Sequence, residues 1–240
     1  MHSIQVISDI HSEFGLSPDK FRNLLVPADF TLLAGDVVTS PSYLRKYLEV
    51  AKEFSKHVIF VCGNHEYYKG YTEDDYIQIF TEIASDGESA IHFLNRDRIC
   101  IEGIWFTGAT LWSNISDYAA KMMNDPLTAD QIRSKHLLDL DWLNNNMLEG
   151  DIVITHHLPS LLLIHPKYAG SLISSGFATY LNEHISRLKP LIWICGHTHT
   201  PFDIIYDRTR LVVNPVGYPG ENKEFKPMII YIKSSIDIYL

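Results

Sequence analysis

Five short runs of Asp, Asn and His residues each follow directly on an apolar segment of four or five residues. The runs are Asp9-Ile10-His11, Gly35-Asp36, Gly63-Asn64-His65-Glu66, His156-His157 and Gly196-His197-Thr198-His199. The apolar segments span residues 4–8, 30–34, 58–62, 152–155 and 192–195. Such segments predict buried strands, with the polar residues emerging in the loops at their carboxyl ends. The pattern therefore predicts an open α/β sheet that gathers all five runs at one edge, where such sheets bind ligands.

The side chains in these runs offer carboxylate oxygens, an amide oxygen and imidazole nitrogens. This mixture suits borderline divalent metals such as Mn, Fe, Zn or Ni, because calcium sites use oxygen alone and structural zinc sites favour thiolates. Asp9 and His11 are separated by one residue, as are His197 and His199, so each pair can chelate an ion. Together the runs predict the ligands of one two-metal site.

The order of the runs resembles the pattern of the calcineurin-like metallophosphoesterase superfamily, and the resemblance covers residues 4–217. It implies two divalent metal ions, either Mn, Fe, Zn or Ni. The implied ligands of the first ion are Asp9, His11, Asp36 and His199, and those of the second are Asp36, Asn64, His156 and His197, with Asp36 bridging. Residues 108–112, 123–125 and 217–222 also resemble a bacterial branch of small, mostly uncharacterised members.

The resemblance implies an enzyme, a metal-dependent phosphatase or phosphodiesterase. It would hydrolyse a small phosphomonoester or phosphodiester, with nucleotides among the candidates, by direct attack of metal-bound water and without a phosphoenzyme. His65 is implied as the catalytic general acid at the leaving oxygen. A nuclease and a non-catalytic metal-binding scaffold of the same fold are the alternatives. The scaffold is the weaker alternative, because it has no need of His65.

The residue that would pair with His65 differs from the protein-phosphatase branch of the superfamily. That branch has an Asp three residues after the bridging Asp, and Thr39 occupies this position here. Without the carboxylate we expect the imidazolium form of His65 to be less favoured, and the acid limb of the rate profile to lie at lower pH. The Asp-Arg-Gly sequence of those phosphatases is also missing after Asp36, which argues against a phosphoprotein substrate.

Several residues outside the ligand set are candidate substrate contacts. His156 directly follows its strand and is the expected ligand of the doublet, which leaves His157 for the phosphate or for a hydrogen bond to the loop at Pro159. Asn124, Asp125 and Tyr218 are further candidates. Aromatic residues near the motifs could rim the pocket or simply pack, and three cations could meet an outer phosphate or simply face solvent. These residues are Tyr67, Tyr68, Trp112, Tyr168 and Tyr218, and Lys121, Lys167 and Arg210.

Composition limits the partners and the compartment. A net charge of −9 without a basic run argues against nucleic acid as a partner. Cys62, Cys100 and Cys195 are odd in number and lie in apolar contexts, which favours reduced thiols in a cytoplasmic protein. The first strand-like segment begins at residue 4, and no apolar run approaches the length of a membrane span, so no signal peptide and no membrane partner is expected.

Strand and helix signals alternate along the chain, which predicts an α/β fold. Ser17-Pro18, Ser40-Pro41, Thr72 and the Thr128/Gln131 pair each predict a helix start. Segments 202–206, 211–214, 228–232 and 236–239 predict consecutive strands of a second sheet, with a hairpin turn at 207–210. The family's four-layer αββα sandwich of two mixed sheets flanked by helices agrees with this. We expect a single domain over residues 1–240, with candidate cap segments at 111–148 and 158–177.

Overall fold

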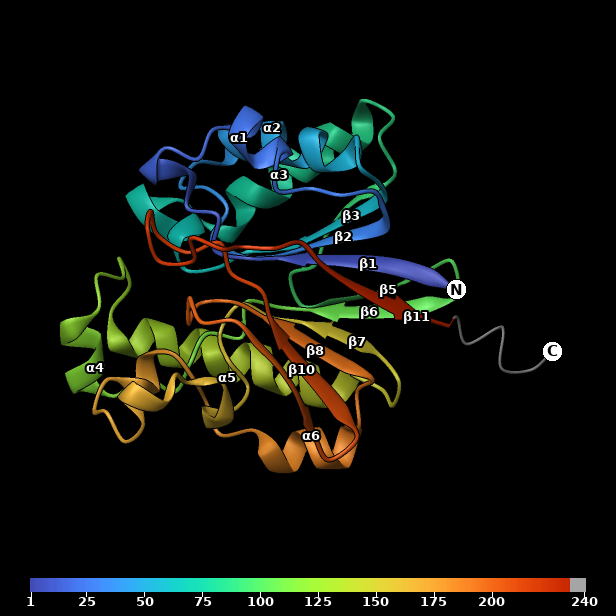
Figure 1. Cartoon of the computed structure of the whole chain (residues 1–240). Helices are drawn as coiled ribbons and strands as arrows, with labels where there is room; N and C mark the ends of the chain where they lie inside the picture. The colour runs from blue at the N-terminus through green and yellow to red at the C-terminus, as the bar shows by residue number, and fades with distance from the viewer. Residues whose placement is uncertain (234–240) are drawn as a thin grey trace.

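Two mixed β-sheets stack face to face, and helices cover the outer face of each (Figure 1). The computed structural model describes residues 1–233. The five-stranded sheet has the order β11 (Met228–Ile232), β1 (His2–Ile7), β2 (Ala28–Ala34), β3 (Ser55–Val61) and β4 (Ile91–Phe93). The six-stranded sheet has the order β5 (Asp97–Ile101), β6 (Ile104–Gly108), β7 (Ile152–Ile154), β8 (Ile192–Cys195), β10 (Thr209–Val213) and β9 (Phe202–Tyr206). The expected four-layer αββα fold is thereby confirmed.

The helices divide between the two outer faces. Helices α1 (Pro18–Arg22), α2 (Pro41–Lys52) and α3 (Glu73–Ser85) cover the five-stranded sheet. Helices α5 (Ala129–Asn146) and α6 (Asn182–Leu188) cover the six-stranded sheet, and α4 (Asp117–Met122) lies at the loop end. Five short 3-10 helices lie in the loops, namely η1 (Ser12–Phe14), η2 (His65–Gly70), η3 (Leu161–Leu163), η4 (Pro166–Tyr168) and η5 (Ser174–Gly176).

The central strands β2, β3, β7 and β8 are buried on both faces along most of their length, which explains why they are almost continuously apolar. On β2, Leu32 packs between the two sheets, whereas its neighbour Leu33 packs under the helices. Ile194 and Trp193 of β8 divide in the same way between the inter-sheet core and the core beneath α5 and α6. Side chains alternate between faces along a strand, so a strand buried on both faces needs apolar residues at every position.

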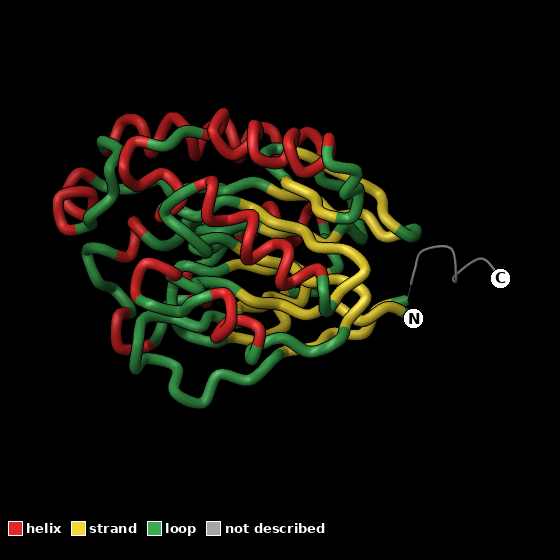
Figure 2. Tube along the Cα trace, turned by 90° about the horizontal axis from the view of Figure 1, so that it is seen from above, coloured by secondary structure: helices red, strands yellow, loops and turns green. Residues whose placement is uncertain are grey.

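The predicted metal motifs come from two sheets rather than from one. Strands β1, β2 and β3 are parallel to one another, and so are β7, β8 and β10. An isolated bridge between Ser8 and Pro215 joins the ends of the two sheets. Figure 2 shows the loops and short helices gathered at the end of the molecule away from the N-terminus. The prediction of one sheet edge was therefore wrong in detail, because the carboxyl ends of two stacked sheets form the site together.

The predicted helix starts are confirmed, with Ser17, Ser40, Thr72 and Thr128 preceding α1, α2, α3 and α5. Thr72 with Asp75 and Thr128 with Gln131 each form a capping box, which satisfies backbone N–H groups that the first helical turn leaves free. Helix α5, within the proposed cap segment 111–148, buries Leu143 against the six-stranded sheet.

The last quarter of the chain differs from the prediction. Strands β9 and β10 form the expected hairpin, with its turn at Asp207 and Arg208, but they extend a sheet that β5 to β8 had begun. Strand β11 leaves that sheet and pairs antiparallel with β1 in the other one. The predicted strand at 236–239 lies outside the described residues. No helix within residues 1–233 is long and apolar enough to cross a membrane.

Candidate metal centre

Five of the predicted ligands have a left-handed backbone that non-glycine residues rarely adopt. The φ angles are 54° at Asp9, 48° at His11, 55° at Asp36, 68° at His197 and 50° at His199. Each such residue costs on the order of 1 kcal/mol, and strain of this kind gathers at functional sites where the surrounding fold enforces it. The backbone strain in the turns after β1, β2 and β8 therefore indicates that these turns orient the side chains of the predicted ligands.

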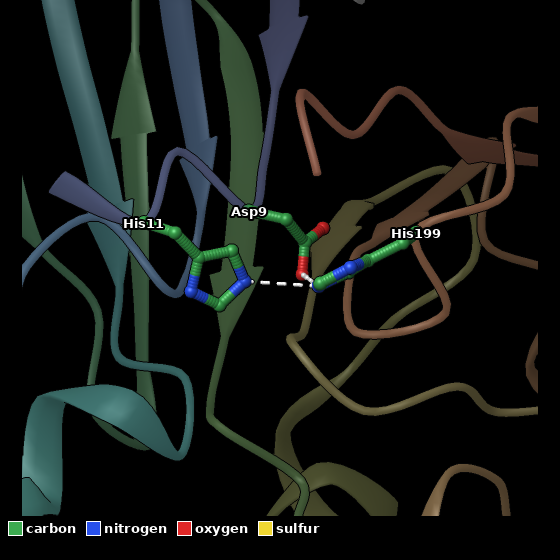
Figure 3. A group of neighbouring side chains, drawn as sticks. All are labelled: Asp9, His11 and His199. Atoms are coloured by element: carbon green, nitrogen blue, oxygen red, sulfur yellow. Dashed lines mark hydrogen bonds and ion pairs between the residues drawn. The ribbon is translucent and has the colours of Figure 1, made fainter. Parts of the chain in front are cut away.

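One group of donors lies where β1 and β8 end (Figure 3). Nε2 of His11 lies 2.9 Å from Nε2 of His199, which in turn lies 3.4 Å from Oδ1 of Asp9. Asp9 and His11 are essentially inaccessible to solvent. A backbone hydrogen bond fixes the carboxylate, because the N–H of His197 donates to Oδ1 of Asp9 at 2.8 Å.

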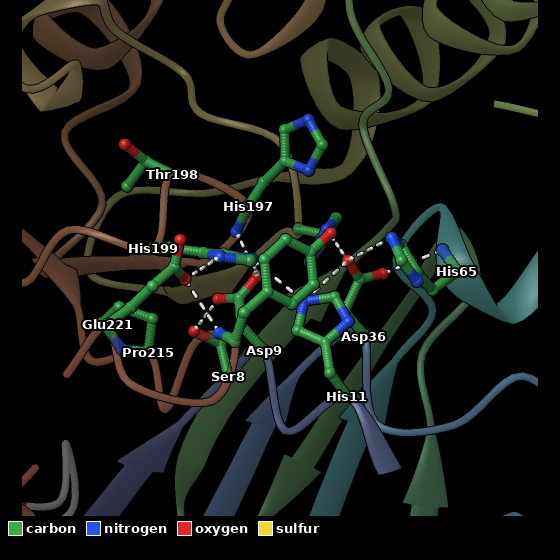
Figure 4. A network of polar contacts seen from close by, with 12 residues as sticks. Ser8, Asp9, His11, Asp36, His65, His197, Thr198, His199, Pro215 and Glu221 are labelled. Atoms are coloured by element: carbon green, nitrogen blue, oxygen red, sulfur yellow. Dashed lines mark hydrogen bonds and ion pairs between the residues drawn. The ribbon is translucent and has the colours of Figure 1, made fainter. Parts of the chain in front are cut away.

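A second group lies beside the first, and its Asp36 also faces His11 of the first group. Oδ2 of Asp36 is 3.2 Å from Nε2 of His156 and 3.7 Å from Nε2 of His11. The ligand atoms of Asp36, His156 and His197 lie within 4.8 Å of one another, and Oδ1 of Asn64 lies 3.2 Å from Nε2 of His156. Figure 4 shows the side chains of Asp9, His11 and Asp36 gathered together at this point.

The four histidines of these groups each have one ring nitrogen already occupied by an oxygen acceptor. Nδ1 of His11 lies 3.1 Å from Glu13, and Nδ1 of His199 lies 2.7 Å from Glu221. Nδ1 of His156 lies 2.8 Å from the carbonyl of Ala34, and Nε2 of His197 lies 3.3 Å from the carbonyl of Gly176. Donation of the ring N–H to these oxygens directs the other nitrogen of each ring into the donor groups, where a metal ion can replace its proton. Nε2 of His11 and Nε2 of His199 face each other at 2.9 Å, a separation that fits a shared cation.

The electrostatics of the site also favour bound positive charge. Burial opposes protonation of His199, but Asp9 and Glu221 outweigh it and raise its pKa to about 9. Burial likewise opposes protonation of His156, and Asp36 raises its pKa to about 9. Burial would raise the pKa of Asp36, yet the surrounding histidines hold it well below its usual range. Carboxylates that draw protons onto their neighbours this strongly will accept a divalent cation in place of those protons.

Glu66 fixes the loop that carries Asp36, a role that the sequence did not reveal. Its Oε2 accepts from the backbone N–H groups of Asp36 (2.9 Å) and Gly63 (2.6 Å), and its Oε1 from those of Val37 (2.8 Å) and Val38 (3.0 Å). Gly63 must be glycine, because a Cβ there would collide with the carboxylate of Asp36. Glu66, the fourth residue of the Gly-Asn-His-Glu run, therefore supports the loop, whereas Asn64, the second residue, faces the donor groups.

Glu13 is the carboxylate partner of His65. Its Oε1 lies 2.7 Å from Nδ1 of His65 and 3.1 Å from Nδ1 of His11. Burial would raise the pKa of Glu13, but hydrogen bonds from the two histidines lower it to about 2. Burial would lower the pKa of His65, but Asp36 and Glu13 raise it. Glu13 therefore supplies the carboxylate that is missing at Thr39, and the less favoured imidazolium expected from that absence is not found.

Two further carboxylates orient predicted ligands. Glu221 lies against His199 (Figure 4) and also accepts from the backbone N–H of Tyr218 at 2.8 Å. Oδ1 of Asp125 accepts from Nδ2 of Asn64 at 2.7 Å, which turns the amide oxygen of Asn64 toward His156. Neither residue belongs to the five ligand runs. Asp125 lies in segment 123–125 and Glu221 in segment 217–222, two further segments that resemble the family, and this was the available signal.

A pocket of about 350 Å³ opens over the donor groups. Asn124 and Tyr218, both candidate substrate contacts, line it, and the ring of Tyr218 lies 4.5 Å from that of His11. His157 does not line it: the residue is 1% exposed, and its ring packs 4.3 Å from that of His197. Its ring therefore lies behind His197 rather than on the pocket wall, and the described residues offer its Nδ1 no hydrogen-bond partner.

The other aromatic residues and cations divide between pocket and packing. Tyr68 and Tyr168 line the pocket, whereas Tyr67 and Trp112 are buried and pack on each other at 5.1 Å. None of the three cations lines the pocket: Lys121 and Lys167 are exposed, and Arg210 forms an ion pair with Asp203 on the β9–β10 hairpin.

Comparisons with known proteins agree with this geometry. A family model described as calcineurin-like phosphoesterase matches residues 2–201. An uncharacterised protein of Acanthamoeba polyphaga mimivirus is 26% identical over 269 residues, covering 95% of each chain. A phosphopantetheinyl hydrolase of Mycobacterium tuberculosis has a similar fold, with a TM-score of 0.68 and 19% identity over 94% of this chain and 93% of that one. A Thermus thermophilus protein gives a TM-score of 0.57 and 13% identity over 97% and 99%.

Proposed function

Because the chain belongs to the calcineurin-like phosphoesterase family of metal-dependent phosphoester hydrolases, we propose that it holds two divalent metal ions and hydrolyses a small phosphomonoester or phosphodiester. The observation that carries the proposal is the position of Asp36. Its carboxylate faces donors of both groups, with Oδ2 within 3.7 Å of His11 and 3.2 Å of His156. A carboxylate shared in this way suits two ions rather than one.

The proposed ligands of the first ion are Asp9, His11, Asp36 and His199, and those of the second are Asp36, Asn64, His156 and His197. The donors are imidazole nitrogens, carboxylates and one amide, which fits Mn, Fe, Zn or Ni better than calcium. Separations of 2.9–3.7 Å between neighbouring donors, as at His11, His199 and Asp36, match ligands that each lie about 2.0–2.2 Å from a common ion.

When bound, the two ions would clamp the phosphate oxygens and acidify the attacking water. The chain itself supplies the proton for the leaving oxygen. His65 lines the pocket beside Asp36 and is held by Glu13 through Nδ1, so Nε2 is the nitrogen free to donate a proton toward the substrate. Glu13 and Asp36 raise the pKa of His65 above its usual range, which favours the protonated ring that a general acid requires.

The substrate candidates differ in what they attach to the phosphate. A nucleotide could stack its base on Tyr218 or Tyr68, which both line the pocket. A phosphopantetheinyl group is a second candidate, favoured by the similar fold of the Mycobacterium tuberculosis hydrolase and by the apolar side chains over the donor groups. A nuclease is disfavoured by the net charge of −9.

The experiment is hydrolysis of 4-nitrophenyl phosphate and bis(4-nitrophenyl) phosphate by metal-stripped protein, before and after addition of Mn, Zn or Ni. We expect no turnover without metal and restored turnover of one ester with metal. His65→Ala should keep the metals and lose turnover of esters with poor leaving groups. Protein that binds two ions and hydrolyses neither ester, nor any nucleotide or pantetheine ester, would be a metal-binding scaffold instead.

A further inference from the structure

The pocket over the donor groups has a polar floor and an apolar roof. Its floor is formed by the metal motifs, and its roof includes Met122, Met123, Ile164, Ile173 and Phe177. We propose that this roof selects phosphoesters with one phosphoryl group and an uncharged, apolar organic group, and rejects substrates with a second anionic group. The proposal rests on the proposed phosphoesterase function and names the substrate class of that site.

The roof is a fixed part of the fold, built from two chain segments that hold each other in place. A Cβ at Gly176 would approach the side chain of Met123 to 3.3 Å, so the two segments touch directly. The N–H of Ser116 donates to Oγ of Ser175 at 3.1 Å, and the N–H of Asn114 donates to Oγ1 of Thr179 at 3.1 Å. Residues 113–125 and 164–179 are therefore joined across the pocket.

The apolar surface continues down to the metal ligands. The ring of Phe177 packs on that of His197 with centroids 5.0 Å apart. The ring of Tyr68 stacks on that of His65 at 4.2 Å, with an angle of 19° between the planes. The organic group of a bound ester would therefore leave the phosphate between Phe177 on one side and Tyr68 on the other, and would meet carbon on both.

The pocket offers no cation of its own to a second anionic group. Among the described residues that line it there is no Lys and no Arg, and its charged side chains other than Asp36 and the histidines are the acids Asp125 and Glu221. Lys167, next to the pocket residue Tyr168, is exposed with Nζ 4.6 Å from the centre of that ring. The bound ions would neutralise one phosphoryl group, whereas a second would be desolvated against apolar atoms and carboxylates.

The volume of the pocket also favours a small ester with one phosphoryl group. Its volume of about 350 Å³ is near the lower end of the range of about 300–1,000 Å³ for small-molecule sites. A short alkyl chain or a single ring fits beside the phosphate. A nucleoside polyphosphate or a dinucleotide would need both more room and more positive charge.

The test compares two substrates that differ only in a distant phosphate, hexyl phosphate and 1,6-hexanediol bisphosphate, in the metal-loaded protein. For diesterase activity, the corresponding pair carries a 4-nitrophenyl ester on the phosphate that is hydrolysed and leaves the distant phosphate of the second member free. We expect kcat/KM to be at least about tenfold higher for the singly phosphorylated member. Equal or faster hydrolysis of the bisphosphate member would overturn the proposal.

A pair of lysine variants locates the effect in the roof. Ile164→Lys adds a cation to the pocket wall. It should lower the ratio of kcat/KM for hexyl phosphate to kcat/KM for the bisphosphate about three- to fivefold. Leu162→Lys is the matched control, two residues away, 50% exposed and outside the lining. An equal change in both variants, or no change in Ile164→Lys, would contradict selection by the roof.

Binding separates this proposal from the proposed function. Titration of the manganese-loaded protein with hexylphosphonate and with 1,6-hexanediyl bisphosphonate measures selection without turnover. Preferred binding of the monophosphonate by a protein that hydrolyses nothing would retain the pocket proposal and overturn the phosphoesterase. Turnover combined with preferred binding of the bisphosphonate would retain the phosphoesterase function and overturn the pocket proposal.

Discussion

At the scale of single residues, the clustering of the candidate metal donors could be predicted from sequence, but the contacts of their supporting carboxylates could not. The donors lie in contiguous runs at strand ends, where chain order alone brings them together. The supporting carboxylates Glu13, Glu221 and Asp125 each act across a turn or between segments, so their partners could not be read from sequence even where the segment itself resembled the family. Glu13 is the instructive case, because it lies two residues from His11 and yet also reaches His65.

Glu13 should act on catalysis through His65. With saturating metal, we expect Glu13→Ala to lower kcat/KM about 10- to 100-fold for an alkyl ester and less for a 4-nitrophenyl ester. The reason is that a poor leaving group needs the proton from His65, whereas 4-nitrophenolate leaves unaided. Glu149→Ala, at an exposed position, is the control. An equal loss on both esters would mean that Glu13 only maintains the fold.

Glu66 should act on stability and on the metal site together. In Glu66→Gln an amide N–H₂ replaces one of two oxygens that each accept two backbone N–H groups. We expect the free energy of unfolding to fall by about 3 kcal/mol, because two buried donors lose their acceptor. Thermal unfolding would measure this as a lowered Tm, with Glu149→Gln unchanged. A Tm within a degree of wild type would refute the proposed role of Glu66 in holding the Asp36 loop.

At the scale of elements, the helix starts and most strands could be predicted because their signals are local. Capping boxes at Thr72 and Thr128 and continuous apolar runs need no knowledge of distant residues. The partner of β11 could not be predicted, because its apolar run would suit either sheet. It pairs with β1, and the N–H of Gly217 and that of Val216 donate to backbone oxygens of the β1 end on the way.

An ion-pair network between elements should give stability a defined pH dependence. Glu73 at the start of α3 contacts Arg96 at 2.6 Å and Lys135 of α5 at 2.8 Å. Burial would raise the pKa of Glu73, but these cations lower it from 4.5 to about 2. Because the carboxylate is more acidic in the folded state, its contribution is complete above about pH 4.5 and is lost as pH falls toward about 2.

Glu73→Gln tests this contribution. We expect the variant to be less stable than wild type by on the order of 1 kcal/mol at pH 6, because solvent still reaches both cations and screens the ion pairs. The difference should shrink toward zero near pH 2, as measured by urea unfolding across pH. A difference that stays constant from pH 6 to pH 2 would show that charge on Glu73 is not responsible.

At the scale of the whole molecule, the sequence predicted the class of fold and the existence of a second sheet. The sequence could not show which strand belongs to which sheet, because the five motifs look alike whether their strands lie in one sheet or in two. The assembled site spans the ends of both: Asp9, Asp36 and Asn64 follow strands of one sheet, and His156 and His197 follow strands of the other. Metal ligands shared between sheets should therefore hold the two halves together.

Metal removal should reveal this link as a loss of thermal stability. At a metal concentration about 100 times Kd, binding adds about 2.7 kcal/mol, which corresponds to roughly 5–10 °C in Tm for a chain of this length. Calorimetry with and without a chelator measures the shift. Asp36→Asn should abolish it, because the carboxylate that faces both groups is gone. A chelator-insensitive Tm in a protein shown to bind metal would contradict a ligand set that joins the sheets.

The most direct test of the dinuclear centre is anomalous X-ray scattering from crystals of the manganese-loaded protein. Two peaks about 3.5–4 Å apart on either side of the Asp36 carboxylate are expected. One peak should lie among Asp9, His11 and His199, and the other among Asn64, His156 and His197. A single peak at full occupancy, or two peaks that Asp36 does not separate, would contradict the proposed centre.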